Sequence, residues 1–325
     1  MMQTTSTTQA FHDACRTGHL EIAQWIFDKN DRKINVEKKY DALHFACING
    51  HLEVAKWLLL LKTEDDAEFN ISANNEHIFR RVCENGHLEV AKWLIKQKPD
   101  INISAENEHA FKSVCFYGYL KVAKWLLAKK PDINISFDNE KAFYWACLNG
   151  HLKVAQWLLE KKPDINISVE NEKVFRLVCL RGKLKTAQWL LKIKPDINIS
   201  AETEYAFCWA CCYGHLEVAQ WLLEQKPNIN LSVGNECAFR WACFRGHSEV
   251  AQWLQSLRPW LYKIIVVKKE NEKIQLISYI YTEEEQRFQR RKYMVWLYSL
   301  NNKMNKECVF HKLPNELLRV IAMTL

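Results

Sequence analysis

Residues 107–136 read NEHAFKSVCFYGYLKVAKWLLAKKPDINIS, and the same pattern returns along most of the chain. The recurring unit is N-E-x-A-F-x-x-x-C-x-x-G-H-L-x-V-A-x-W-L-L-x-x-K-P-D-I-N-I-S. A pattern that returns at a fixed period of about 20–50 residues is the signature of a repeat architecture. The unit therefore predicts a fold built from repeated copies of one structure.

Tryptophan, glycine and cysteine show the period most clearly. Of the 13 tryptophans in the 325-residue chain, eight are 32 residues apart except for one step of 36: Trp25, Trp57, Trp93, Trp125, Trp157, Trp189, Trp221 and Trp253. Eight of the nine glycines keep the same spacing: Gly18, Gly50, Gly86, Gly118, Gly150, Gly182, Gly214 and Gly246. A cysteine stands three residues before each of these glycines: Cys15, Cys47, Cys83, Cys115, Cys147, Cys179, Cys211 and Cys243. The period predicts eight copies of one structural unit.

Each copy has the pattern of two helices followed by an extended loop. In the quoted copy, we expect Asn107 to cap the first helix and Glu108 to favour its N-terminus. Gly118 permits the left-handed turn that ends this helix. The second helix carries an apolar stripe at helical spacing, and a proline stops it. Residues 132–136 alternate polar and apolar side chains, which predicts an extended or hairpin segment, and residues 101–104 are likewise expected to be extended and exposed.

The second half of the unit resembles a known repeat family. G-H-L-x-V-A-x-W-L-L followed by D-I-N resembles the second half of an ankyrin repeat, and residues 41–47 (DALHFAC) are similar to the family's T-P-L-H-x-A-A. The other copies depart from it at N-E-x-A-F, so we expect the first helix to start a residue or two early. The resemblance covers residues 7–259, and this variant of the pattern is similar to ankyrin proteins of large DNA viruses that infect amoebae. It implies an all-α ankyrin-repeat solenoid of helix-turn-helix-hairpin units with a degenerate C-terminal helical cap.

The chain is divided into four parts on this basis. Residues 1–9 are interpreted as a polar N-terminal tail, residues 10–259 as eight ankyrin-like repeats, residues 260–303 as a degenerate capping repeat and residues 304–325 as a C-terminal helix. Each repeat buries its apolar stripe only against its neighbours, so the ends need caps with one polar face. Within the capping segment, residues 263–267 (KIIVV) predict a strand or a hairpin.

The C-terminal segment carries a second resemblance. Residues 312–321 read KLPNELLRVI, with a proline near a helix start and an acidic residue in its first turn. L-P-x-E-L-L-x-x-I resembles the opening of an F-box, the helical motif that binds the Skp adaptor of cullin ubiquitin ligases. Ankyrin arrays that end in a truncated F-box are known from poxviruses as the PRANC arrangement. The resemblance implies an adaptor-binding set: Leu313, Pro314, Glu316, Leu317, Leu318 and Ile321. The alternative is an amphipathic helix that packs on the cap.

Composition predicts the class of protein and its compartment. Hydrophobic residues make up 48% and charged residues 26%, which excludes a disordered chain. The longest apolar run, Trp57 to Leu61, is too short to cross a bilayer, and no membrane partner is expected. The first ten residues, MMQTTSTTQA, predict no secretory signal. Twelve cysteines without such a signal favour a reducing compartment, so we expect an intracellular protein, in the host cytoplasm for a viral one.

The repeated polar and aromatic residues are interpreted as structural. Neighbouring helices about 8–10 Å apart hold the array cysteines too far from one another for disulfides, so these are expected as buried thiols. The histidines after the glycines are expected to bond loop carbonyls, and the repeated tryptophans to lie in the core between repeats. The local cluster Cys208, Cys211, Cys212 and His215 lacks the distant second pair that zinc sites use. No phosphate loop, G-x-S-x-G or H-E-x-x-H occurs, so the sequence predicts no enzyme, metal or cofactor.

Two positions between the array cysteine and glycine vary while the rest of the unit repeats. In an ankyrin stack the concave face is made by first helices and hairpin tips, so variation there is consistent with recognition. Exposed apolar residues often mark interaction sites, and aromatic residues with arginine supply much of the binding energy. The predicted partner-binding residues are Phe116, Tyr117, Arg181, Tyr213, Phe244 and Arg245. The alternative is that some of them pack along the interface between first helices.

The sequence therefore predicts a monomeric, non-catalytic scaffold for protein–protein interaction. In the first hypothesis it is a substrate adaptor: the array holds a protein client and the C-terminal helix recruits a cullin ubiquitin ligase through a Skp-type adaptor. In the second it is a passive binder of a host protein with a structural tail. The third, and less favoured, hypothesis is nucleic-acid binding through the basic end, because +6 of the net charge of +7 lies in residues 255–325.

Overall fold

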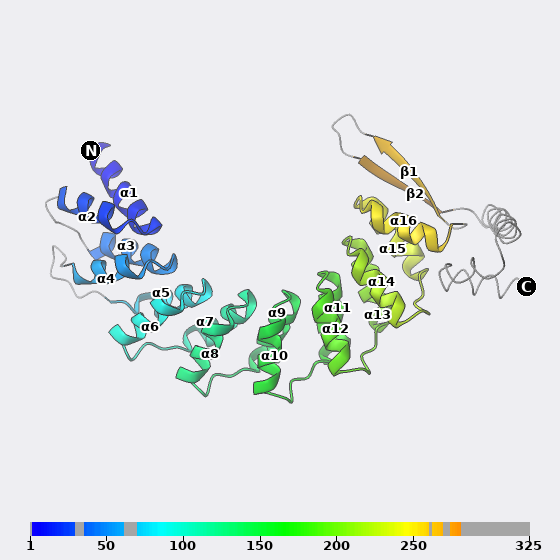
Figure 1. Cartoon of the computed structure of the whole chain (residues 1–325), viewed down its shortest axis with the longest axis horizontal. Coiled ribbons are helices and arrows are strands. Elements are labelled where there is room, and N and C mark those ends of the chain that lie inside the picture. The colour runs from blue at the N-terminus through cyan, green and yellow to red at the C-terminus, as the bar shows by residue number, and fades with distance from the viewer. Residues whose placement is uncertain (1, 30–35, 62–69, 260–261, 269–273, 281–325) are drawn as a thin grey trace, which may run out of the picture. The chain divides into compact units, whose positions relative to one another are not determined.

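Paired helices make up almost all of the described chain. The computed structural model describes residues 2–29, 36–61, 70–259, 262–268 and 274–280. Over these residues it has sixteen helices followed by two strands. The chain divides into two compact units, residues 1–165 and 166–325, and within each unit the helix pairs are stacked side by side (Figure 1). The all-α solenoid predicted from the sequence is confirmed, with a short β-hairpin after the last pair.

The eight pairs follow the sequence period. The first helices are α1 (Met2–Thr17), α3 (Val36–Ile48), α5 (Ala73–Glu84), α7 (Ala105–Tyr117), α9 (Phe137–Leu148), α11 (Val169–Leu180), α13 (Ala201–Cys212) and α15 (Val233–Phe244). The second helices are α2 (Leu20–Lys29), α4 (Leu52–Leu60), α6 (Leu88–Gln97), α8 (Leu120–Lys129), α10 (Leu152–Lys161), α12 (Leu184–Ile193), α14 (Leu216–Gln225) and α16 (Ser248–Leu257). Inside each unit, the first helix of a pair contacts the first helix of the next pair.

A glycine turn joins the two helices of each pair, as predicted. Gly118 follows α7 with a φ of 83°, a left-handed conformation that glycine adopts without steric cost. The ring of His151, from the next repeat, packs directly over it: a Cβ added to Gly118 would lie 2.4 Å from Nδ1 of His151. The predicted histidine–carbonyl bond is confirmed in the second repeat, where Nε2 of His51 lies 2.9 Å from the carbonyl oxygen of Arg16 in the first repeat.

Aromatic contacts close the core between repeats. Phe111 of α7 is fully buried, and its ring centre lies 6.3 Å from that of Trp157 in the next repeat. Phe207 of α13 contacts Trp253 in the same way, at 6.2 Å. The predicted position of these tryptophans between repeats is confirmed. Trp25 departs from it with 63% of its surface exposed, because the first pair has no preceding phenylalanine among the described residues.

The array cysteines are buried free thiols, as predicted. All eight lie in the core, at the position of the first helix where neighbouring helices approach. Burial disfavours the thiolate and raises the pKa of Cys47 to about 12. A thiol held in its neutral form packs as a small apolar residue.

The start of the first helix differs from the prediction. Glu106, Asn107 and Glu108 have positive φ values of 54°, 54° and 61°, so they form a left-handed turn ahead of the right-handed part of α7. Asn107 lies inside this turn and is not an N-cap. Each L-residue in this conformation costs about 1–2 kcal/mol. The turn recurs at residues 74–76, 170–172, 202–204 and 234–236.

Hydrogen bonds to one glutamate offset the cost of this turn. The hydroxyl of Ser104 donates to the carboxylate of Glu108 at 2.7 Å. In the following repeat Ser136 donates to Glu140 at 2.8 Å, and Nζ of Lys162 lies 3.0 Å from the same carboxylate. A hydrogen bond to a charged group contributes about 1.5–3 kcal/mol, so one such bond offsets part of the strain of the three-residue turn. The glutamate therefore joins the start of the first helix to the end of the second.

The loop after the second helix also differs from the prediction. Residues 101–104 were expected to be extended and exposed, but Ile101 is only 6% exposed. Asn102 makes a local turn instead, because its side-chain oxygen accepts a hydrogen bond from the backbone N–H of Ser104 at 3.1 Å. The apolar residue of D-I-N is drawn into the core, so these loops do not form hairpins in the described array.

The two ends of the array depart from the predicted divisions. Residues 2–9, assigned to a polar tail, are the first part of α1. After α16, β1 (Tyr262–Lys268) and β2 (Ile274–Ile280) form an antiparallel hairpin, which confirms the predicted strand at residues 263–267. The hairpin contacts α15 and α16, so in the described part of residues 260–303 a hairpin lies against the last pair. Residues 281–325 lie outside the described residues.

Replacing Gly118 by alanine is expected to destabilise the array. The left-handed backbone costs an L-residue about 1–2 kcal/mol, and the new methyl group would overlap the His151 ring. We expect Gly118→Ala to lower the free energy of unfolding by about 2–4 kcal/mol, measured by urea denaturation.

Gly246→Ala is the matched control for this substitution. Gly246 has a similar φ of 77°, but an added Cβ would meet no described atom within 4 Å. Gly246→Ala should lose only the free energy that the left-handed backbone costs. Gly118→Ala should therefore lower the free energy of unfolding by at least about 1 kcal/mol more. Equal losses would show that the packing of His151 on Gly118 does not stabilise the array.

Candidate functional site

Seven side chains on the first helices of the second unit form a continuous row, the aromatic–arginine ladder. They come from α11, α13 and α15 or from the residue directly after a helix: Arg176, Tyr205, Trp209, Tyr213, Trp241, Phe244 and Arg245. The row crosses three successive repeats. Helical spacing aligns the members that share a helix, and the stacking of the repeats joins one helix to the next.

The first half of the ladder runs from α11 onto α13. The guanidinium carbon of Arg176 lies 4.9 Å from the ring centre of Tyr205, within the range of a cation–π contact. The Nε of Arg176 donates a hydrogen bond to the carbonyl oxygen of Asn171 at 2.9 Å, which holds the side chain in place. The ring centres of Tyr205 and Trp209 are 5.6 Å apart, and those of Trp209 and Tyr213 are 5.8 Å apart.

The second half of the ladder runs from α13 onto α15. The guanidinium carbon of Arg245 lies 4.3 Å from the ring centre of Tyr213 and 5.8 Å from that of Trp241. The rings of Trp241 and Phe244 meet edge to face, with centres 5.4 Å apart. Arg245 therefore bridges two aromatic rings that belong to neighbouring repeats.

The ladder displays apolar and positively charged surface together. Tyr213 is 40% exposed, Trp241 44% and Phe244 75%. Arg181 and Arg240 are exposed on the same helices or directly after them. Glu204 of α13 and Glu236 of α15 are buried, so their carboxylates do not neutralise this surface from outside. Exposed aromatic rings beside arginines have the composition of binding hot spots.

Three of the predicted partner-binding residues lie in the ladder. Arg245 contacts Tyr213 directly, and Trp241 joins Arg245 to Phe244. Arg181 is exposed directly after α11 but is not part of the ladder, because Arg176 is the residue of α11 that contacts Tyr205.

The other two predicted residues belong to the first unit and form a smaller cluster. The ring of Phe116 packs against Tyr117 and Trp145, with centres 4.8 and 5.3 Å away. The carbonyl oxygen of Phe116 accepts a hydrogen bond from Nδ2 of Asn149 in the next repeat, at 3.0 Å. Phe116 is half-buried and packs between first helices, while Tyr117 is exposed.

Sequence reasoning missed four ladder residues: Arg176, Tyr205, Trp209 and Trp241. A signal for two of them was present, because Trp145, Trp209 and Trp241 fall outside the 32-residue tryptophan register yet share one position, two residues before the array cysteine. Arg176 and Tyr205 carry no such signal. Their contact depends on the placement of one helix beside the next.

The predicted adaptor-binding residues lie outside the described residues. They are Leu313, Pro314, Glu316, Leu317, Leu318 and Ile321. Their binding to an adaptor is therefore a proposal.

Sequence comparison identifies the family of the repeats. A family model described as "Ankyrin repeats (3 copies)" matches residues 2–74, 79–169 and 175–259. The chain belongs to the ankyrin-repeat family. A comparison with curated proteins finds no significant match. Ankyrin repeats indicate a protein–protein interaction scaffold, and proteins of this family are generally non-catalytic interaction modules.

Two solved structures of ankyrin proteins are similar to this chain. The human ASB11 ankyrin repeat domain is 17% identical, with 65% of this chain and 96% of that one covered and a TM-score of 0.47. An ankyrin repeat family protein from Legionella pneumophila is 22% identical, with 73% and 77% covered and a TM-score of 0.34.

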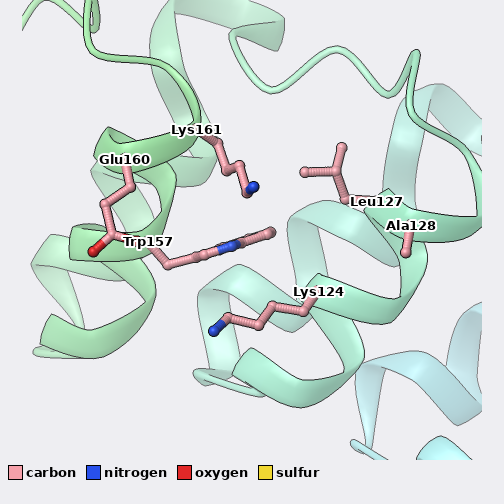
Figure 2. Close-up of a pocket in the computed structure, with 6 residues that line it drawn as sticks. All are labelled: Lys124, Leu127, Ala128, Trp157, Glu160 and Lys161. Carbon is pink, nitrogen blue, oxygen red and sulfur yellow. The ribbon is translucent and has the colours of Figure 1, made fainter.

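A shallow groove lies between the second helices of the fourth and fifth ankyrin repeats. It measures about 400 Å³ and is lined by Lys124, Leu127, Ala128, Trp157, Glu160 and Lys161. Figure 2 shows Lys124 and Lys161 extending toward the Trp157 ring from α8 and α10. A groove of about 440 Å³ recurs between α12 and α14, beside Trp221. Because the groove follows the tryptophan register, we interpret it as a product of repeat packing.

The described ankyrin repeats hold no convergent group of metal ligands. No three histidine, cysteine, aspartate or glutamate side chains come together in a metal-binding arrangement within the part of the chain that the structure describes. In the local cluster, Cys208, Cys211 and Cys212 are buried thiols, and the ring of His215 is bonded to the carbonyl of Leu180. None of the described helices combines the length and the apolar character needed to cross a bilayer.

Two histidines stack between first helices in the first unit. The rings of His44 on α3 and His77 on α5 are nearly parallel, with centres 4.9 Å apart. Burial lowers the pKa of His44 below its ordinary 6.5, and the neighbouring His77 and Arg81 lower it further. Burial is the main cause that lowers the pKa of His77, and the positive charges of Arg80 and Arg81 lower it further. The folded ankyrin array therefore favours both rings in their neutral form.

Acidification should destabilise the array through this pair. The unfolded histidines bind protons at a higher pH than the folded ones, so the stability is fully present above the ordinary pKa and is lost as the pH falls below it. We expect a lower urea midpoint at about pH 5.5 than at about pH 7.5.

His44→Phe is the variant that isolates the pair. The buried Nε2 of His44 has no hydrogen-bond partner among the described residues, so a phenyl ring loses no bond there and can still stack on His77. The acid-induced drop in midpoint should be smaller in His44→Phe than in the wild type. An identical drop in both proteins would assign the pH dependence to other groups.

Proposed function

We propose that this ankyrin protein binds a protein partner through the aromatic–arginine ladder. The observation that carries the proposal is the exposure of Tyr213, Trp241 and Phe244 in one row that also contains two arginines. A contiguous apolar surface that water contacts in the free protein favours burial by a partner. The rings and guanidinium groups are already in contact with one another, so little ordering is needed on binding.

The chemistry of the ladder defines the partner. Arg176 and Arg245 of the ladder, with the exposed Arg181 and Arg240 of the same repeats, favour carboxylates, because planar guanidinium groups form paired hydrogen bonds with them. The aromatic rings favour apolar or aromatic side chains. The partner is therefore a protein segment in which acidic residues alternate with apolar ones.

A finer proposal assigns the C-terminal residues to a second partner. Leu313, Pro314, Glu316, Leu317, Leu318 and Ile321 resemble the opening of an F-box, so residues 304–325 would recruit a Skp-type adaptor of a cullin ubiquitin ligase. The protein would then act as a monomeric substrate adaptor in the cytoplasm of a host cell, because its repeats resemble those of large DNA viruses. In the alternative, the protein is a passive binder whose tail is structural.

The ladder should dominate binding of the partner. Trp241→Ala combined with Phe244→Ala removes two aromatic rings from the row, and we expect at least tenfold weaker partner binding, since 1.4 kcal/mol corresponds to tenfold in affinity. The measurement is a quantitative pull-down from host-cell lysate, with affinity determined for the partner that it identifies.

Leu60→Ala is the control for this test. Leu60 is 82% exposed on a second helix of the first unit, so the control removes exposed apolar surface outside the ladder. It should retain the partner fully. Equal retention by the ladder variant and the control would overturn the proposal. Binding of a single-stranded oligonucleotide with a steep salt dependence, and of no protein, would favour the nucleic-acid hypothesis instead.

The tail proposal has a separate test. Fully burying one leucine side chain stabilises a complex by about 1.5–3 kcal/mol, so Leu317→Asp should weaken adaptor binding at least tenfold. The comparison is a pull-down of purified Skp-type adaptor with the wild type, Leu317→Asp and a chain lacking residues 306–325. If no form binds adaptor and Leu317→Asp lowers the melting temperature, the tail is structural and the passive binder stands.

A further inference from the structure

Two cysteines outside the repeating register meet beneath the ladder. Cys208 on α13 directly precedes Trp209, and Cys237 on α15 lies four residues before Trp241. Their side chains are hydrogen-bonded to each other across the boundary between two repeats. Both thiols are free.

The repeat geometry explains why these two positions meet. Cys208 stands one residue after the buried Phe207, and Cys237 stands two residues before the buried Phe239. One layer earlier, the same two positions hold Arg176 and Tyr205, whose side chains are in contact at 4.9 Å. The array cysteines differ because they occupy equivalent positions on parallel helices. Cys208 and Cys237 lie about one helical turn out of register, so their side chains approach each other diagonally.

The two thiols have unequal environments. Cys237 is half-buried and lies directly after the left-handed turn at residues 234–236, whereas Cys208 is only 8% exposed. The hydrogen bond from Cys208 lowers the pKa of Cys237, and the same bond together with burial raises the pKa of Cys208. Cys237 is thus the accessible sulfur with thiolate character, the property that makes a cysteine nucleophilic. Cys208 is the sheltered sulfur beside it.

We propose that Cys208 and Cys237 form a reversible disulfide that links the seventh and eighth repeats. The oxidant is a low-molecular-weight disulfide of the oxidised-glutathione class. The Cys237 thiolate attacks one sulfur of this oxidant, forms a mixed disulfide and releases one small-molecule thiolate. Cys208, after losing its proton to solvent, attacks the Cys237 sulfur and releases the second thiolate. Two protein thiols are oxidised and one small disulfide is reduced to two thiols.

The disulfide would act on the ladder without touching a partner. It closes a chain segment from residue 208 to residue 237 and fixes α13 against α15, the two helices that carry Trp209 and Trp241. A disulfide restricts the conformations of the unfolded chain and so raises the free energy of unfolding. Oxidation would therefore stiffen the part of the ladder that crosses these repeats. The proposal stands whether or not the ladder binds the proposed partner.

Oxidation of the native full chain with oxidised glutathione tests the proposal. Cleavage after Glu217 and Glu236 places the two cysteines on different peptides, so mass spectrometry after alkylation can identify a Cys208–Cys237 cross-link. We expect this cross-link as the main product, a rise in melting temperature of about 5 °C or more, and reversal of both by a reducing agent.

Three variants separate the possible outcomes. Cys208→Ser should stop at a mixed disulfide of Cys237 with glutathione, and Cys237→Ser should leave Cys208 unmodified in the native protein. Cys212→Ser is the matched control, because Cys212 is a buried neighbour on α13 that the proposal does not use, and it should behave as the wild type. A stable mixed disulfide in the wild type, a cross-link through Cys211 or Cys212, or reaction only after unfolding would overturn the proposal.

Discussion

The structure depends on the contact that each ankyrin repeat makes with the next one. Phe111 is fully buried and packs beside Trp157 of the following repeat, and Gly118 leaves the space that the ring of His151 fills. Neither contact exists inside a single helix pair. A repeat therefore buries its apolar side only in an array. Trp25, which has no preceding repeat among the described residues, shows this surface uncovered.

This dependence leaves part of each first helix free to vary. The position two residues before the array cysteine holds Ser113 in one repeat and Trp145, Trp209 or Trp241 in others, while the buried phenylalanine and cysteine beside it are retained. Stacking does not constrain that position, so its side chain can be selected for binding. Trp209 and Trp241 of the ladder occupy this position, and Arg176 and Tyr205 extend the ladder from other positions of the first helices.

Each repeat also contains a local strain and the contacts that offset it. The left-handed turn at residues 106–108 is unfavourable for L-residues, yet it directs a glutamate inward, where serine and lysine side chains bond related carboxylates such as that of Glu140. Asparagine tolerates this backbone better than most residues, and Gly234 replaces one position of the turn in the last repeat. The motif N-E thus forms part of the left-handed turn, and its two residues are not the helix cap that their types suggest.

The sequence alone determined the repeat, its period and the residues that share its core. A strict spacing of phenylalanine, cysteine, glycine and tryptophan determines which side chains face a neighbour, and it predicts the helix pairs, the turn at Gly118 and the burial of Cys147. Tertiary structure alone decided the ladder and the thiol pair. Arg176 meets Tyr205, and Cys208 meets a cysteine of the next repeat, because neighbouring first helices pack with a particular offset along their axes. That offset results from side-chain packing between repeats, and no pattern within one repeat specifies it.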